Sequence, residues 1–133
     1  MAQTTCRTTS TNPVPVRGEV WLVRFDPSVG AEIQKLRPAV VMSAAAIGRL
    51  PLRIVVPITD WKPAYAGFPW FVHLAASPEN GLLLKESGAD AFQTKSVALS
   101  RFERRLGRLA DEEIEKISAA IALCVGYVPR SAP

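Results

Sequence analysis

Residues 17–43 read RGEVWLVRFDPSVGAEIQKLRPAVVMS, two apolar runs joined by a loop that contains glycine. In the first run, residues 19–26, apolar side chains recur at every second position, which predicts a β-strand with one face toward a core. The second run, residues 38–43, is a nearly continuous apolar stretch and predicts a second strand. Pro38 fits at its first position, because proline has no N–H to give to a β-ladder. The sequence therefore predicts two successive strands with a loop over residues 27–37.

An arginine occupies the last loop position before the second strand. Arg37 is followed directly by Pro38, whose ring fixes the backbone where the strand begins. Such a position is poor for a charge that only keeps the protein soluble, and good for a charge that must be held still. The alternative is an ordinary surface arginine at a strand start.

The rest of the chain continues as short β-segments and ends in one helix. The predicted strands are residues 52–59, 69–75, 82–85 and 91–99, and the predicted helix is residues 110–128. Residues 104–109 are expected to be extended or turn-like. Strands and helices do not alternate as they would in a parallel sheet. We therefore expect a mainly β fold, a small and strongly curved antiparallel barrel or half-barrel with a packed C-terminal helix.

Length and composition indicate one domain with short tails. The chain has 133 residues, of which 48% are hydrophobic, enough for a single core. We expect residues 1–15 to be a disordered tail, residues 16–128 the folded domain, and residues 129–133 a C-terminal tail. No apolar run is long enough to cross a membrane, and no signal peptide is recognisable. The expected location is the cytoplasm.

Metal and cysteine chemistry find little support in the sequence. The two cysteines, Cys6 and Cys124, form no CxxC pair, and the only histidine is His73. We expect no metal site and no cofactor, and we expect Cys124 to be a small core residue. The motifs of serine hydrolases, P-loop proteins, zinc proteases and dinucleotide-binding folds are absent.

Arginine chemistry on RNA remains. The net charge is +4 and the pI about 9.4, which permits an anionic partner. RNA carries its own nucleophile, the 2′-OH, so a protein that cleaves it must mainly position and stabilise the reacting phosphate. Arg37 begins one predicted strand and Thr59 ends the next, and these ends lie side by side in an antiparallel pair. The alternatives are a surface arginine and an ordinary β-forming threonine.

The wording of the sequence is more specific than its composition. Residues 17–43 closely resemble the opening of the MazF/PemK toxins, roughly RG-D/E-V-x-x-V-x-F-D-P-x-x-G-x-E-x-x-K-x-RPAVV-x-S. VVPIT at residues 55–59 resembles the second motif of that family, and DAFQTKSVALSRFERRLGRL at residues 90–109 resembles its third. The resemblance covers about residues 16–126.

This resemblance implies a fold, an activity and partners. It implies an SH3-like barrel, a homodimer and a cognate MazE-like antitoxin. The implied activity is sequence-specific, metal-independent endoribonuclease cleavage of single-stranded RNA. By position, Arg37 and Thr59 match the family's catalytic arginine and threonine. The resemblance, together with the need of single-stranded RNA for stacking partners, assigns RNA contacts to five further residues, namely Glu32, Lys35, Trp61, Gln93 and Lys95. Lys95 departs from the pattern, because arginine is commoner there and would make a bidentate contact.

Two other functions remain open at this stage. A CcdB-like gyrase poison would share the barrel but act by binding a protein, and fold alone does not separate it from a nuclease. A non-catalytic RNA-binding barrel would keep RNA affinity without turnover. The pair of Arg37 and Thr59 favours the nuclease. Trp61 and Tyr65, in the loop after Thr59, are expected either to stack on RNA bases or to pack within the protein or at a dimer interface.

Overall fold

The structure is a computed structural model that describes residues 14–27, 29–32, 35–47, 49–82 and 85–128. These residues form seven β-strands, one α-helix and four short 3-10 turns. The strands are β2 (Glu19–Arg24), β3 (Leu36–Val41), β4 (Leu52–Asp60), β5 (Phe71–Leu74), β6 (Ser87–Asp90), β7 (Lys95–Ala98) and β8 (Phe102–Arg108), and the helix is α2 (Asp111–Cys124). The 3-10 turns are η1 (Ala45–Ile47), η2 (Pro63–Gly67), η3 (Ala91–Gln93) and η4 (Leu99–Arg101).

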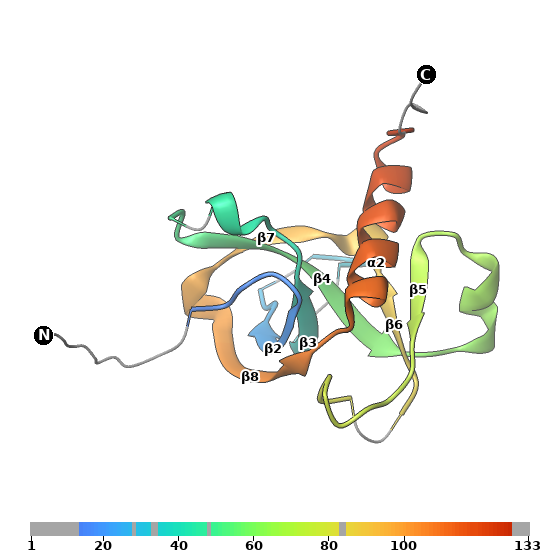
Figure 1. Ribbon diagram of the computed structural model, residues 1–133, viewed down its shortest axis with the longest axis horizontal. Coiled ribbons are helices and arrows are strands. Elements are labelled where there is room, and N and C mark those ends of the chain that lie inside the picture. Colours follow the sequence, from blue (N-terminus) through green and yellow to red (C-terminus); the bar gives the residue numbers. More distant parts are fainter. Residues whose placement is uncertain (1–13, 28, 33–34, 48, 83–84, 129–133) are drawn as a thin grey trace, which may run out of the picture.

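All strand pairs are antiparallel, and β4 is the strand that joins the two halves of the sheet. The order is β5-β6-β4-β3-β2-β8, and β7 pairs with the first half of β4. The strands curl around one another, while α2 stands beside β5 (Figure 1) and packs against β5 and η3. The predicted mainly β fold with a C-terminal helix is confirmed.

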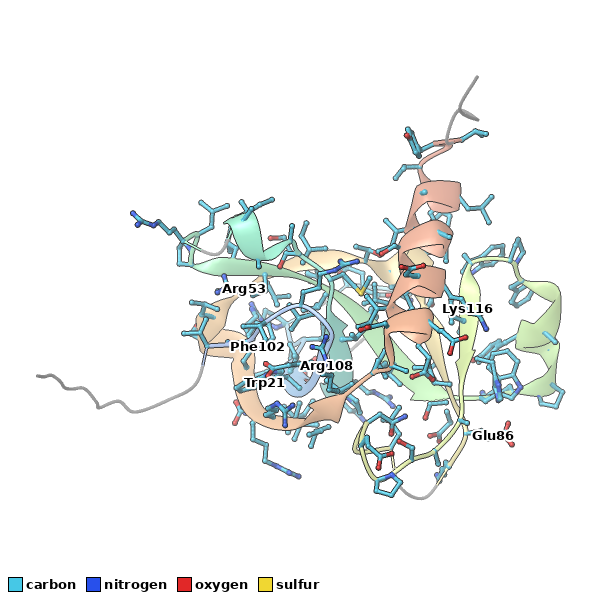
Figure 2. The ribbon with its side chains drawn as sticks, in the orientation of Figure 1. Trp21, Arg53, Glu86, Phe102, Arg108 and Lys116 are labelled. Carbon is cyan, nitrogen blue, oxygen red and sulfur yellow. The ribbon has the colours of Figure 1, made fainter. Side chains whose placement is uncertain are left out.

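Two cores lie on the opposite faces of the central strands. Val20, Val40 and Val56 lie in one row and face the helix, in a cluster that also includes Ile114 and Ile117 of α2. Their neighbours face the other way, into a second cluster made of Trp21, Val23, Phe25, Ala39, Val41, Val55 and Val97. Trp21 and Phe102 meet edge to face within it (Figure 2), with ring centroids 5.8 Å apart. Burial on both faces explains why residues 38–43 are almost continuously apolar.

Strand β3 begins earlier than predicted. Its first residue is Leu36, so Arg37 lies inside the strand, opposite Val23 of β2, rather than in the loop. Pro38 is compatible with this position. Met42 donates its N–H to Ile54 of β4, so the alternation of an antiparallel ladder points the nitrogen of Pro38 toward β4 as well. The β3–β4 ladder begins only at Ala39, so the missing donor costs no ladder hydrogen bond.

The predicted strand at residues 82–85 is wrong. Residues 83–84 lie outside the described residues, and neither Leu82 nor Lys85 belongs to a strand; the strand is β6, which begins at Ser87. Gly88 lies inside this strand, between the predicted strands, and the strand pairs with both β4 and β5. A Cβ at Gly88 would lie 3.0 Å from the ring of Trp61 and 3.1 Å from that of Phe71. The glycine therefore makes room for two aromatic rings over the strand, a role that its local sequence does not reveal.

Helix α2 is shorter than predicted, ending at Cys124 rather than near residue 128. Gly126 adopts a φ of +74°, a left-handed conformation that suits a residue just past a helix C-terminus. Val125 and Val128, which the helical periodicity had placed in the apolar stripe, are exposed. At the other end, Glu113 accepts a hydrogen bond from the N–H of Ala110 and holds the first turn.

The chain is tied to the domain from Pro15 onward. Pro15 is buried, and its carbonyl accepts a hydrogen bond from Nε of Arg53, itself 6% exposed. Arg17 donates to the carbonyl of Met42 and to Oγ of Ser118. The expected tail boundary at residue 15 therefore falls on a residue that packs against the domain.

The close approach of the backbone at Gly107 to the backbone of Glu79 and Asn80 gives a stability prediction. A Cβ at Gly107 of β8 would overlap the backbone of Glu79 and Asn80, so Gly107→Ala should lower the free energy of unfolding by about 2–3 kcal/mol. Urea denaturation at fixed protein concentration measures this. Gly67→Ala is the matched control, because nothing lies within 4 Å of its Cβ position; it should change stability by less than about 0.5 kcal/mol. Equal effects of the two substitutions would contradict this packing.

Candidate functional site

Arg37 and Thr59 line one open pocket of about 440 Å³. The ladder between β3 and β4 pairs Ala39 with Pro57, so the same register, continued by two residues, places Arg37 opposite Thr59. Arg37 is exposed and Thr59 is half-buried. The guanidinium and the hydroxyl therefore belong to neighbouring strands at the same end of the sheet.

Backbone pairing holds both residues in place. Arg37 is paired with Val23, which is fully buried, and Thr59 is paired with Gly88 of β6. Pro57 lies between the part of β4 that pairs with β7 and the part that pairs with β6. The site is thus built on strands rather than on a loop, which favours a fixed geometry.

The far wall of this pocket comes from residues that the sequence did not single out. Asp60, next to Thr59, forms an ion pair with Lys85, with Nζ 3.3 Å from Oδ2. Gly81 and Ser87 also line the pocket. Asp60 could have been suspected from its place directly after Thr59, but the segment around Gly81 and Lys85 reaches the pocket only through the tertiary fold.

A second pocket, of about 400 Å³, gathers three of the predicted RNA-contact residues. Glu32, Gln93 and Lys95 line it, together with Phe92 and Thr94. Among the described residues, the ammonium of Lys95 has no ion-pair partner within 4 Å. Phe92 is 68% exposed and was not singled out from the sequence. A carboxylate, an amide, a cation and an aromatic ring therefore surround one cavity.

Hydrogen bonds fasten the described part of the loop between β2 and β3. The side-chain amide of Gln93 donates to the carbonyl of Ala31 at 3.2 Å, and Oε1 of Glu32 accepts from the N–H of Val29 at 2.6 Å. Lys35 has a φ of +68°, and its N–H donates to Oδ1 of Asp26. Its side chain is exposed and lines neither pocket. The loop is thus tied to η3 at one point and to the end of β2 at another.

Trp61 packs within an aromatic group instead of lining either pocket. Its ring meets those of Tyr65 and His73 edge to face, at centroid distances of 5.8 and 4.7 Å, and covers Gly88. Tyr65 in turn stacks on Phe71, with ring centroids 4.0 Å apart. In the structure, Trp61 and Tyr65 therefore both pack against other aromatic residues of the chain.

Residues 101–108, in η4 and β8, form a basic run with four arginines, and most of these are engaged within the fold. Arg105 pairs with Glu19, Arg108 lies 3.7 Å from Asp111, and Arg101 donates to the carbonyls of Arg24 and Asp26. Arg24 itself pairs with Glu103. In the described part of the chain, Arg104 has no such partner. The run is therefore chiefly a set of structural contacts.

Cysteine chemistry finds no support in the site. Cys124 is half-buried in α2, and burial, together with the charge of Asp90, raises the pKa of its thiol, which makes the thiolate scarce at neutral pH. No three His, Cys, Asp or Glu side chains come together as metal ligands among the residues that the structure describes. In the same part of the chain, no helix is long and apolar enough to span a membrane.

Comparison with known proteins places this geometry in a family. A sequence model of the PemK-like, MazF-like toxins of type II toxin-antitoxin systems matches residues 16–125. The endoribonuclease MazF9 of Mycobacterium tuberculosis is 32% identical over 114 residues, covering 80% of this chain and 92% of that protein. The endoribonuclease toxin ChpB of Escherichia coli K12 is 36% identical over 104 residues, covering 75% and 84%.

A solved structure agrees with these relatives. The crystal structure of MazF from Deinococcus radiodurans superposes with a TM-score of 0.73 at 26% identity, covering 86% of this chain and 99% of that one. The family model spans nearly the whole described domain, including the strands that carry Arg37 and Thr59. The chain belongs to the PemK-like, MazF-like toxin family of type II toxin-antitoxin systems.

Proposed function

We propose that this chain is an endoribonuclease toxin that cleaves single-stranded RNA, with Arg37 and Thr59 as its catalytic residues. The observation that carries the proposal is that these two residues line one open pocket. Membership in the family, and relatives named as endoribonucleases, support the same activity.

The reaction uses the substrate's own hydroxyl. The 2′ oxygen attacks the adjacent phosphorus and loses its proton, the bond from phosphorus to the 5′ oxygen breaks, and that oxygen gains a proton. The products are a 2′,3′-cyclic phosphate and a 5′-hydroxyl. In this pathway the guanidinium of Arg37 presents a fork of donors to the phosphate oxygens as negative charge develops on them. The Thr59 hydroxyl gives one further hydrogen bond, and no metal-bound water is needed.

The second pocket serves as the binding site for nucleotides beside the cut. Lys95 supplies a positive charge for a phosphate, and Glu32 and Gln93 supply groups that can hydrogen-bond to base edges. Lys35 lies on the exposed loop between the two strands and adds a charge near the path of the RNA. Trp61 acts in this proposal through its support of the strand next to Thr59, because its ring packs over Gly88.

The two other candidate functions are less well supported. A gyrase poison would have no use for an arginine and a threonine held together at a strand end. A non-catalytic RNA-binding barrel would not need an arginine and a threonine to line the same pocket. Relatives that cover four fifths of this chain carry the name endoribonuclease, which also favours the nuclease.

A cognate, MazE-like antitoxin and a second copy of this chain are the proposed protein partners. Family membership supports the antitoxin. The homodimer is supported by an exposed apolar strip at η1 and the first half of β4, formed by Ile47, Leu50, Leu52 and Ile54, each more than 40% exposed. Such a strip is typical of a surface that a partner covers.

Loss of the arginine should abolish cleavage. Because a donor aimed at developing charge contributes about 3–4 kcal/mol, Arg37→Ala should lower kcat by about 100- to 1,000-fold. Thr59→Val, which removes only the hydroxyl, should lower it about tenfold or more. Cleavage of a long single-stranded RNA, mapped by primer extension, measures both. Arg104→Ala removes the same charge from outside the two pockets and should cut at the wild-type rate; a comparable loss in that variant would contradict the assignment.

The substrate chemistry gives an independent prediction. An oligonucleotide with a single 2′-deoxy nucleotide on the 5′ side of the mapped cut should resist cleavage there and still bind. Cleavage of the all-ribose oligonucleotide should continue in EDTA, and its new 3′ ends should be cyclic phosphates. Cutting at the deoxy position, or an activity abolished by EDTA, would show that another mechanism operates.

The proposed dimer predicts a mass in solution of twice the 14.4 kDa chain, measured by light scattering after gel filtration. Leu52→Glu together with Ile54→Glu should halve that mass, because the charges would lie in the apolar strip. The matched double variant Arg104→Glu and Glu112→Lys places exposed charge changes outside the strip and should leave the mass unchanged. A wild-type monomer at micromolar concentration would overturn the dimer.

A further inference from the structure

Phe92 is an exposed aromatic residue that, unlike the exposed Phe68 and Tyr127, lines the second pocket. It is 68% exposed, whereas Trp61, Tyr65, Trp70 and Phe71 are all half-buried in the aromatic group that extends from η2 to β5. A single exposed aromatic residue is unremarkable in itself. Phe92, however, forms a wall of the second pocket.

The backbone beneath Phe92 is rigidly fixed. Its N–H donates to Oδ1 of Asp90 at 3.1 Å, and the N–H of the preceding, buried Ala91 donates to the carbonyl of Trp70. The hydroxyl of Thr94 closes the turn by donating to the carbonyl of Ala91 at 2.6 Å. These three hydrogen bonds fix a turn of three residues, η3, whose central side chain is exposed. An exposed ring on such a base loses little conformational freedom when something stacks on it.

An aromatic neighbour supports the ring. Trp70 meets it edge to face, with centroids 6.0 Å apart and planes inclined by 67°, and Trp70 is in turn stacked on Phe68 at 4.9 Å. Edge-on support of this kind orients a ring while leaving a face uncovered. Phe92 lines a cavity that is also lined by Glu32, Gln93 and Lys95.

The chemistry of this cavity fits a nucleobase. A base needs a flat apolar surface for its π-face, hydrogen-bonding groups for its edge, and a cation for the attached phosphate. Phe92 supplies the first, Glu32 and Gln93 the second, and Lys95 the third. Its volume of about 400 Å³ lies within the range of about 300–1,000 Å³ for sites that hold small ligands.

The position of the cavity relative to the catalytic pair fits a flanking nucleotide. Lys95 pairs with Val55 of β4, and Thr59 lies four residues further along the same strand. Four residues of extended chain span about 13 Å. The base in this cavity would therefore belong to a nucleotide beside the cut and not to the one that is cleaved.

We infer that Phe92 is a base-stacking residue that holds one nucleobase of the RNA next to the scissile phosphate, and so contributes to the choice of cleavage site. This inference rests on the proposed ribonuclease function. The family pattern assigned polar contacts to Gln93 and Lys95, and the structure adds an aromatic platform beside them.

The test removes one base of the RNA at a time and measures whether the resulting loss of kcat/KM depends on Phe92. Short RNA oligonucleotides centred on a mapped wild-type cut would carry an abasic nucleotide at each position in turn. For the wild-type chain, one flanking position should lower kcat/KM about tenfold, the usual effect of losing one stacked base. Phe92→Ala should be about tenfold slower on intact RNA and insensitive, within twofold, to the abasic nucleotide at that same position. Phe92→Trp should keep the wild-type pattern.

A direct signal of stacking complements the kinetics. With 2-aminopurine at that position and a 2′-deoxy nucleotide at the cut, binding should quench the fluorescence of the base, and Phe92→Ala should remove the quenching. Tyr127→Ala is the matched control, because Tyr127 is similarly exposed, at 62%, but lines neither pocket; it should behave as wild type in both measurements.

The possible failures are distinguishable. If the wild-type chain cuts RNA and Phe92→Ala shows the unaltered abasic pattern, the stacking role is wrong while the ribonuclease stands. If Phe92→Ala changes the mass in solution, Phe92 belongs to a contact between copies of the chain and the inference is overturned. If the wild-type chain cuts no RNA, the proposed function fails and the base site fails with it.

Discussion

The pairing of β3 with β4 is the interaction on which both the core and the site depend. Its register aligns Val40 with Val56 on the helix side and Ala39 with Pro57 on the other, so both faces of the pair are buried. A slip of one residue would exchange the two faces along the whole strand. The same slip would move Arg37 out of line with Thr59. The hydrophobic burial that fixes the fold therefore also sets the relative positions of Arg37 and Thr59, at no separate cost in free energy.

The two prolines of this pair explain why the strand ends can host a site. The alternation of the ladder points the backbone nitrogen of Pro38 toward β4, at a position before the β3–β4 pairing begins. It points the nitrogen of Pro57 to the other side of β4, between the parts that pair with β7 and with β6. Neither leaves a broken hydrogen bond, and both limit pairing near the edge of the site. The chain there stays fixed in direction but open to solvent, which suits side chains that must meet a substrate.

Local sequence patterns correctly predicted the elements whose formation depends on neighbouring residues in the chain. Alternation identified β2, the continuous apolar run identified β3, and helical spacing with three acids in the first turn identified α2. The errors fall where distant residues decide. Gly88 lies in a strand because two rings from other segments cover it, and the wall formed by Gly81 and Lys85 reaches Arg37 only in the folded chain. The resemblance to a family supplied the candidate residues, but not the separation into two pockets or the exposed Phe92.

The distribution of charge gives the final constraint on how this domain could hold RNA. A net charge of +4 suggests a basic surface, yet most arginines of η4 and β8 are engaged with Glu19, with Asp111 or with backbone carbonyls. Their role is to bind β8 to β2 and to the start of α2. The donor groups of these arginines are therefore occupied within the fold and are less available to phosphates. Under the proposed function, recognition relies on the few cations at the two pockets and on contacts of short range, hydrogen bonds to base edges and stacking, which are also the contacts that discriminate one RNA sequence from another.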